Sequence, residues 1–247
     1  MYTSMTKLIS TFILAFSILT IFGQNKMRPV EELISKSEPG WKLVQRWIDK
    51  AKNKVEVLPC DSAIARDALF KTQVSTRSPM GAIIYSTGGL LIDYGWMRIL
   101  GSGNIKLNRT LPEWNKGKSL KEFNDKPSFL LIADDVIGGF FAVNGGQFGK
   151  DLNKIYYLSP DNLEWKALGL TYTEFLNFCF NSDLNKFYKG LRWTNWNEEV
   201  SKLDGNLVYT FYPFLWTREG KNIDKISRRP IPIEEQFRFN MSRIGND

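Results

Sequence analysis

Apolar residues recur every three or four positions in the part of the chain that follows residue 26. This spacing places apolar side chains on one side of a helix. Three helices are predicted from it, with Val30, Leu33 and Ile34 in the first, Trp41, Val44, Trp47, Ile48 and Ala51 in the second, and Ile64, Ala65, Ala68 and Leu69 in the third. Asp61 or Ser62 can cap the third helix. Between the second and third helices, residues 55–58 (VEVL) predict a strand.

The middle of the chain has apolar runs separated by turn residues, which is typical of strands. Residues 81–101 predict a hairpin with its turn at residues 87–89. Residues 127–146 predict a second pair of strands. Two shorter strands are expected next, in residues 154–160 and 163–170. We therefore expect a mostly antiparallel meander of about six strands.

Helices return towards the end of the chain. Thr171 and Glu174 form a capping box, which predicts the start of a helix. The remaining predicted elements are a helix over residues 195–203, a strand over residues 207–214 and a last helix after Pro232. The polar residues 102–126 predict a long surface loop. The expected fold is a single α+β domain over residues 24–247, with helices from both ends of the chain packed on the sheet.

Residues 1–23 have the pattern of a secretory signal peptide, because Lys7 precedes an apolar stretch, Leu8 to Phe22, that ends at Gly23. We expect cleavage after Gly23 and export to the periplasm or the medium, with no stable membrane insertion afterwards. A membrane anchor is the alternative, but a stretch of about fifteen residues is short for a span of roughly twenty. If translation starts at Met27 instead, the protein is cytoplasmic.

The composition excludes several kinds of chemistry. The 247-residue chain contains no histidine and has a formal net charge of +7. Without histidine, Ser–His and Cys–His nucleophile pairs are excluded, and the two cysteines cannot form a thiolate metal cage. Lys and Arg occur singly or in short pairs, without the stripe that binds a nucleic-acid backbone. We therefore expect no metal or other cofactor, and nucleic acid is not favoured as a partner.

Cys60 and Cys179 have two interpretations. In an exported protein they can form a disulfide. Such a bond would close a loop of about 120 residues and stabilise the fold by about 3–5 kcal/mol. The alternative is a pair of buried free thiols.

The candidate binding residues in the middle of the chain are carboxylates and aromatic residues. Asp134 and Asp135 could hold a cation or act as an acid–base pair. Neighbours on a strand point to opposite faces, however, so a hairpin turn is the favoured interpretation. Tyr94, Trp96 and Arg98 alternate and would share one face of a strand. They could form an exposed aromatic and basic patch for a partner, or pack in the core.

Trp193 and Trp196 are three positions apart and would lie together on a helix. Sugar rings stack on pairs of this kind. A neighbouring helix can cover such a pair in the same way, so both interpretations stay open.

From Met27 to the end, the chain resembles a bacterial family known as domain of unknown function 2625. The resemblance rests on residues 88–103, 127–146 and 155–178. It covers nearly all of the expected mature chain and implies no catalytic residues.

A more distant resemblance is to the SUKH superfamily, whose members often serve as immunity proteins against secreted bacterial toxins. An apolar strand, an acidic turn, a glycine-bearing strand, another strand and a helix with a Phe-Leu pair occur there in that order. The matching positions are residues 129–133, Asp134 with Asp135, residues 138–143, residues 155–158, and Phe175 with Leu176. The resemblance implies a SUKH-like fold. The chain differs from inhibitors of nucleic-acid-cutting toxins, which are expected to be acidic and cytosolic.

These observations predict a noncatalytic, immunity-like protein-binding module of the cell envelope or exterior. One alternative is a protein that binds glycans or the cell envelope through exposed tryptophans. A second is a histidine-free hydrolase that uses a Ser–Lys pair or two close carboxylates.

Overall fold

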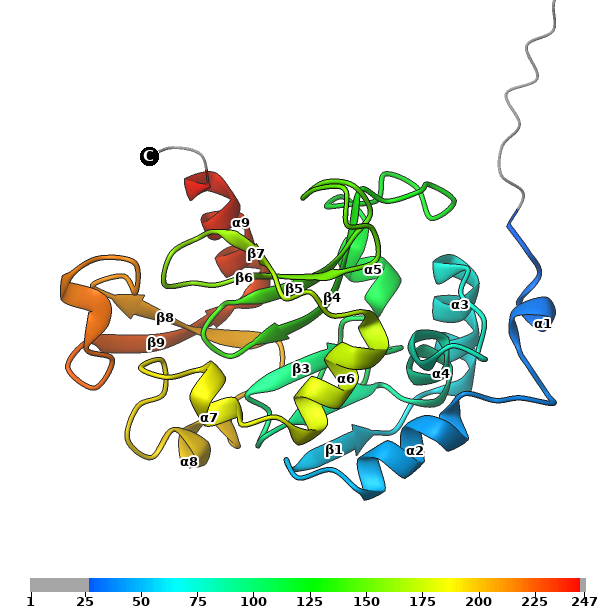
Figure 1. Cartoon of the computed structure of the whole chain (residues 1–247), viewed down its shortest axis with the longest axis horizontal. Coiled ribbons are helices and arrows are strands. Elements are labelled where there is room, and N and C mark those ends of the chain that lie inside the picture. The colour runs from blue at the N-terminus through cyan, green and yellow to red at the C-terminus, as the bar shows by residue number, and fades with distance from the viewer. Residues whose placement is uncertain (1–26, 245–247) are drawn as a thin grey trace, which may run out of the picture.

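The computed structural model describes residues 27–244, and its centre is a seven-stranded antiparallel sheet (Figure 1). Its strands are β1 (Val55–Leu58), β2 (Gly89–Ile92), β3 (Met97–Leu100), β4 (Phe129–Asp135), β5 (Phe140–Asn144), β6 (Ile155–Leu158) and β7 (Trp165–Ala167). They lie side by side in the order of the sequence. A separate two-stranded sheet pairs β8 (Leu207–Tyr212) with β9 (Ser227–Pro232). The predicted α+β fold with a mostly antiparallel meander is confirmed, with more strands than the sequence predicted.

Helices of four to eleven residues precede, interrupt and follow the sheet. They are α1 (Val30–Leu33), α2 (Trp41–Asp49), α3 (Ser62–Thr72), α4 (Pro79–Ser86), α5 (Leu111–Asn115), α6 (Tyr172–Asn181), α7 (Leu184–Phe187), α8 (Trp196–Val200) and α9 (Ile233–Arg243). The predicted capping box is confirmed at the start of α6. The Thr171 N–H donates to Glu174 Oε2 at 2.7 Å, and the Glu174 N–H donates to Thr171 Oγ1 at 3.4 Å.

Cross-strand pairing divides the side chains between the two faces of the large sheet, because directly opposite residues of an antiparallel pair point to the same face. One row of pairs runs through Glu56, Leu91, Arg98, Asp134, Phe140 and Leu158. We call the face that carries this row the pocket face. A neighbouring row runs through Val57, Leu90, Ile99, Ala133, Phe141 and Tyr157. It lies on the opposite side, which we call the helix face.

Helices cover the helix face. The ring of Phe141 lies 5.0 Å from that of Phe175 in α6, and the ring of Tyr157 lies 5.4 Å from that of Phe187 in α7. Helices α2, α4 and α6 contact one another, and Figure 1 shows α6 in front of the central strands. The buried apolar side chains of this face therefore form one layer of the core.

The pocket face is covered only in part. The ring of Phe140 lies 5.1 Å from that of Phe237 in α9, and the N–H of Tyr209 in β8 donates to the Val136 carbonyl at 2.7 Å. The β8–β9 pair and α9 thus cover this face near β4 and β5. At the β1 end, the Glu56 side chain remains 45% exposed. The face is therefore open over β1 to β3.

The apolar segment before residue 87, which we predicted as a strand, is helix α4. Ser78 Oγ accepts a hydrogen bond from the Gly81 N–H at 3.1 Å, and Pro79 occupies the first turn, where its missing N–H costs nothing. Half of the residues of α4 are buried, including Ala82, Ile83 and Ile84, and the others are half-buried. A helix that is buried nearly all round lacks the periodic pattern of an amphipathic helix, and the prediction failed for that reason.

The hairpin in this region is formed by β2 and β3, so the turn predicted at residues 87–89 was wrong. The observed turn contains Asp93 and Tyr94, whose φ angles are 52° and 62°, followed by Gly95 with a φ of 87°. Three consecutive positive φ angles reverse the chain tightly.

Residues 102–126 are not a surface loop throughout, because they contain α5 and several buried apolar side chains. Asn115 at the end of α5 is fully buried. Its Nδ2 donates to the Leu131 carbonyl at 2.8 Å, and its Oδ1 accepts from the Leu131 N–H at 2.8 Å. The pairing register of β4 and β5 shifts next to Leu131. The Asn115 amide therefore satisfies backbone groups at an irregularity of the sheet.

The expected signal peptide, residues 1–23, lies outside the described residues. Among residues 27–244, no helix is long and apolar enough to cross a membrane.

Candidate functional site

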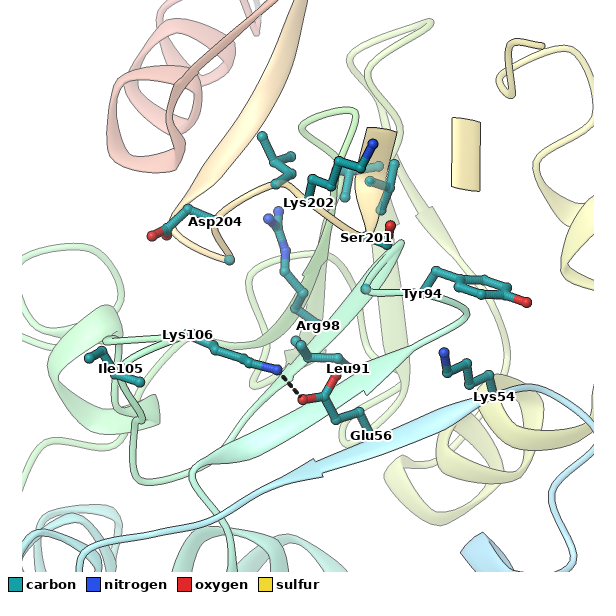
Figure 2. Close-up of a pocket in the computed structure, with 15 residues that line it drawn as sticks. Lys54, Glu56, Leu91, Tyr94, Arg98, Ile105, Lys106, Ser201, Lys202 and Asp204 are labelled. Carbon is teal, nitrogen blue, oxygen red and sulfur yellow. Dashed lines mark hydrogen bonds and ion pairs between the residues drawn. The ribbon is translucent and has the colours of Figure 1, made fainter. Parts of the chain in front are cut away.

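A cleft of about 470 Å³ lies over the open part of the pocket face, and we call it the pocket (Figure 2). Leu91 of β2 and Arg98 of β3 belong to the row of side chains that crosses this face, and both line the pocket. Glu56 of β1 forms an ion pair with Lys106 at the rim. Residues 200–205, which we call the wall segment, line the pocket from the side of β8. A cleft of this size can take a small ligand or a few side chains of a partner.

The wall segment is fastened to the sheet by two arginines. Arg98 Nη1 donates to the Leu207 carbonyl at 2.6 Å, just beyond the segment. Arg109 Nη2 donates to the Gly205 carbonyl at 3.1 Å, and the Gly205 N–H donates to the Lys106 carbonyl at 3.1 Å. The shape of the pocket therefore depends on side chains that lie beneath it.

Asp134 holds both arginines in place. Its Oδ1 lies 2.5 Å from Arg98 Nε, and its Oδ2 lies 2.7 Å from Arg109 Nη1. Arg98 Nη2 also donates to the Asp135 carbonyl at 3.0 Å. Burial lowers the pKa of Arg98, and the negative charge of Asp134 opposes this effect. A buried ion cluster held by several hydrogen bonds fixes geometry, although Arg109 Nε is buried here without a partner among the described residues. Removing one member of the cluster leaves an uncompensated charge.

The rim of the pocket carries more positive than negative charge. Lys54 and Lys202 are exposed there, and neither forms an ion pair with a carboxylate of the described residues. Lys54 Nζ lies 4.5 Å from the ring centroid of Tyr94. The carboxylate of Asp204 accepts hydrogen bonds from the backbone and side-chain amides of Asn206, both at 2.8 Å. Two lysine ammonium groups are therefore available to an anionic ligand.

Asp135 lies on the helix face, in a different environment from Asp134. Its Oδ2 accepts hydrogen bonds from the hydroxyls of Tyr157 and Tyr188 at 2.7 and 3.1 Å. Its Oδ1 accepts from the backbone N–H groups of Ile137 and Gly139 at 3.2 and 2.8 Å. Burial raises the pKa of Asp135 to about 6, and these hydrogen bonds oppose the rise. Asp135 thus makes the local turn contacts expected from the sequence.

The two adjacent carboxylates do not form a shared site. Asp134 pairs with Arg98 of β3 on the pocket face, whereas Asp135 is bound by tyrosines on the helix face. The described residues contain no group of three or more Cys, Asp or Glu side chains placed to hold a metal ion.

The exposed aromatic and basic patch expected at Tyr94, Trp96 and Arg98 is corrected by the structure. Trp96 and Arg98 are fully buried, and Tyr94 is 43% exposed. Strand β3 begins at Met97, so Tyr94 and Trp96 lie in the turn and do not alternate with Arg98 along a strand. Tyr94 and Arg98 nevertheless both line the pocket, one at its rim and one beneath the wall segment.

Trp193 and Trp196 gather around Trp96 instead of presenting a flat surface. The ring of Trp96 lies 5.6 Å from that of Trp193 and 5.0 Å from that of Trp196. The guanidinium of Arg192 lies 4.0 Å from the ring centroid of Trp196 and forms an ion pair with Asp93 at 2.6 Å. Trp196 begins α8, whereas Trp193 precedes it and is buried. The spacing had suggested that the two tryptophans share a helix, but only Trp196 lies in α8.

Cys60 and Cys179 are both free cysteines in the structure. Cys60 is half-buried and its Sγ donates to the Tyr85 carbonyl at 3.8 Å. Cys179 is buried in α6, and burial raises the pKa of its thiol well above the usual range. The structure therefore agrees with the second interpretation, in which Cys60 and Cys179 are free thiols.

Among the described residues that line the pocket, none is an activated nucleophile. Ser201 Oγ donates to the Glu198 carbonyl at 3.0 Å and has no basic partner. The carboxylate of Glu56 is bound by Lys106. The positive rim and the apolar side chains of Leu91, Val136 and Val200 are suited to an amphipathic, negatively charged group.

Sequence reasoning missed Lys54, Lys106, Arg109 and the wall segment. Arg109 lies in the stretch that we predicted as a surface loop, and its partner Asp134 is 25 residues away. One signal was present in the sequence, because Arg98 and Asp134 are residues of opposite charge within two apolar strands, and the structure pairs them directly.

Comparisons with known proteins reveal two relatives. A model described as "Protein of unknown function DUF2625" matches residues 30–236. A Haemophilus influenzae protein described as "Uncharacterized protein" is 47% identical over 216 residues, which are 87% of this chain and 95% of the relative. The "Putative uncharacterized protein YbfG" of Escherichia coli K12 is 42% identical over 197 residues, or 78% of this chain and 87% of the relative. No solved structure matches the chain.

Proposed function

Because the chain belongs to the DUF2625 family, whose description assigns no activity, we propose from the site alone that the protein is a noncatalytic protein-binding module. Its pocket takes acidic side chains of a partner protein. The observation that carries the proposal is the pair of exposed lysines, Lys54 and Lys202, at the rim of a cleft with a partly apolar lining.

Charge and shape together favour an acidic polypeptide. Each lysine would donate a charge-assisted hydrogen bond to an acidic side chain, and the apolar groups of Leu91 and Val200 would cover the stem of such a side chain. The buried arginines hold the wall segment in place before binding, so the partner does not have to order it. An anionic small molecule would use the same lysines, and direct binding to a purified partner separates the two cases.

The immunity-like role suggested by the SUKH resemblance is part of this proposal. Export is also part of the proposal, and it would place the pocket in the cell envelope or the medium. A toxin or surface protein with an acidic segment is the kind of partner that the pocket suits.

Affinity capture with residues 24–247 as bait, from the envelope and medium of the producing cell, tests the proposal. Three baits are compared: the unchanged protein, Lys54→Glu with Lys202→Glu, and a control with Lys36→Glu and Lys150→Glu. The control makes the same change of net charge at exposed lysines that do not line the pocket.

We expect one dominant protein to be retained by the unchanged bait and the control bait, and lost from the pocket variant. Titration of the purified partner should then show a loss of affinity of at least tenfold, because each lysine contact contributes about 1 kcal/mol or more. Equal retention by all three baits would contradict a role for the pocket.

A further inference from the structure

Strand β1 is an edge of the seven-stranded sheet, and it borders the pocket directly. In an antiparallel ladder, pairs that exchange two hydrogen bonds alternate with pairs that exchange none. The Asp93 N–H donates to the Lys54 carbonyl at 2.8 Å, so the Lys54–Asp93 pair is of the bonded kind. The N–H and C=O groups of Val55 and Val57 therefore point away from β2.

These outward groups are unpaired within residues 27–244. No described strand lies on the outer side of β1, and no hydrogen bond joins the amide of Val55 or Val57 to another described segment. The side chain of Val57 is 37% exposed. An edge with free donors, free acceptors and an exposed apolar side chain is a template for another strand.

We infer that the outer edge of β1 pairs with an extended segment of the partner protein, which becomes an eighth strand of the sheet. The inference rests on the proposed function and adds a binding mode to it. Backbone hydrogen bonds to Val55 and Val57 hold the segment, and alternate side chains point to the pocket face.

The side chains of β1 define the chemistry of the segment. Residues opposite Val55 and Val57 lie on the helix face beside these valines, so they are apolar. A residue opposite Lys54 lies on the pocket face and is acidic. The residue opposite Glu56 is an uncharged polar one, because a second carboxylate there would be repelled. The expected pattern is acidic, apolar, polar, apolar.

The probe is a labelled peptide with the core Glu-Val-Thr-Val-Glu between Gly-Ser flanks. We expect it to run antiparallel to β1, as β2 does on the other side, and its symmetric core then places a glutamate opposite Lys54. It is titrated into isotope-labelled protein, residues 24–247, and the backbone amide signals of Val55 and Val57 are followed by NMR. This measurement detects weak binding, and we expect both signals to shift.

Two N-methylated probes test the hydrogen bonds themselves. In an antiparallel pair with β1, methylation of both valine nitrogens removes the donors that face β1, whereas methylation at the threonine and one glutamate removes donors that face away from it. We expect the first peptide to bind at least about tenfold more weakly than the second. Equal affinity of the two would overturn strand pairing.

The matching protein variant is Val57→Pro, with Val57→Thr as its control. Proline removes only the outward N–H, so the ladder with β2 keeps its hydrogen bonds, and threonine retains both the N–H and the branched side chain. We expect Val57→Pro to lose the probe and Val57→Thr to bind it. If Val57→Pro does not fold, the N-methylated peptides give the answer on the unchanged protein.

The failure of this inference can be told apart from failure of the proposed function. If Lys54→Glu weakens all the peptides while both N-methylated forms bind equally, the pocket binds acids and the edge of β1 does not pair. If the unmodified peptide leaves the Val55 and Val57 signals unshifted at millimolar concentration, strand pairing is overturned, and the capture experiment still decides the role of the pocket.

Discussion

Asp134 and Asp135 are adjacent in sequence and equally buried, yet they serve opposite faces of the sheet by different physical means. Asp134 is bound by two guanidinium groups on the pocket face. Asp135 is bound by two phenols and two backbone amides on the helix face, and no cationic side chain within residues 27–244 donates to its carboxylate. Asp134 is compensated by opposite charges in direct contact, whereas Asp135 is compensated mainly by neutral donors, with a smaller contribution from the charge of Arg98.

The comparison explains why the pocket face, unlike the helix face, has an open cleft at this end of the sheet. Compensation by charge brings arginines to the pocket face, and their remaining N–H groups fasten the wall segment through the carbonyls of Gly205 and Leu207. The neutral donors to Asp135 come from the turn after β4, from Tyr157 in β6 and from Tyr188 just after α7, so the carboxylate connects these three segments. The first network holds a cleft open at the surface, and the second closes the core.

The largest expected effect comes from Asp134→Ala. The substitution leaves Arg98 and Arg109 as buried, like charges without a counter-ion, so we expect the free energy of unfolding to fall by about 4 kcal/mol. Urea denaturation at pH 7 measures the loss. A change below about 1 kcal/mol would show that the arginines find other partners.

A double substitution sharpens this prediction. Combining Asp134→Leu with Arg98→Met removes one charge of each sign, so the remaining cost should be smaller than for Asp134→Ala. If the double variant is less stable than Asp134→Ala, the hydrogen bonds from Arg98 to the carbonyls of Leu207 and Asp135 outweigh its unpaired charge.

Asp135→Asn is expected to have a smaller effect that depends on pH. The pKa of Asp135 is raised from 3.8 to about 6 in the folded protein, which corresponds to about 3 kcal/mol. Because the folded state binds the proton more tightly than the unfolded state, the stabilisation is fully present below pH 4 and is lost as the pH rises through 6. Asparagine keeps the shape of the side chain and does not titrate.

The measurement is urea denaturation of both proteins between pH 4 and pH 7.5. Relative to Asp135→Asn, the unchanged protein should lose about 2.5 kcal/mol of unfolding free energy across this range, because the unfolded carboxyl is already partly ionised at pH 4. A constant difference across the range would mean that Tyr157 and Tyr188 stabilise the carboxylate enough to offset its burial.

Local signals in the sequence predicted the elements that local interactions determine. The capping box of Thr171 and Glu174 marks the start of α6, and the apolar positions after Pro232 mark α9. Helix α4 was missed because its apolar side chains are buried nearly all round, which removes the periodic pattern. The turn after β2 was missed because Asp93 and Tyr94 adopt positive φ in place of glycine.

The pocket could not be predicted because its parts are distant in sequence. Lys54, Arg98 and the wall segment meet only after β1, β3 and the connection from α8 to β8 are in place. Trp96 illustrates the opposite error, since its alternation with Tyr94 and Arg98 made a buried aromatic residue resemble a binding residue. The residues that hold the site in shape are buried, whereas the residues expected to contact a partner are common surface lysines.

Lys54→Glu with Lys202→Glu should have the smallest effect on stability. Both lysines are exposed and form no ion pair with a described carboxylate, so we expect the free energy of unfolding to change by no more than about 0.5 kcal/mol. Urea denaturation of this variant and of the Lys36→Glu, Lys150→Glu control measures the change.

A loss above about 1 kcal/mol would show that the rim lysines, like the buried arginines, hold the wall segment. Any loss of partner binding would then result from a changed pocket shape. An unchanged stability with lost binding assigns the rim charges to recognition and the buried charges to architecture, which is the division that the two faces of the sheet imply.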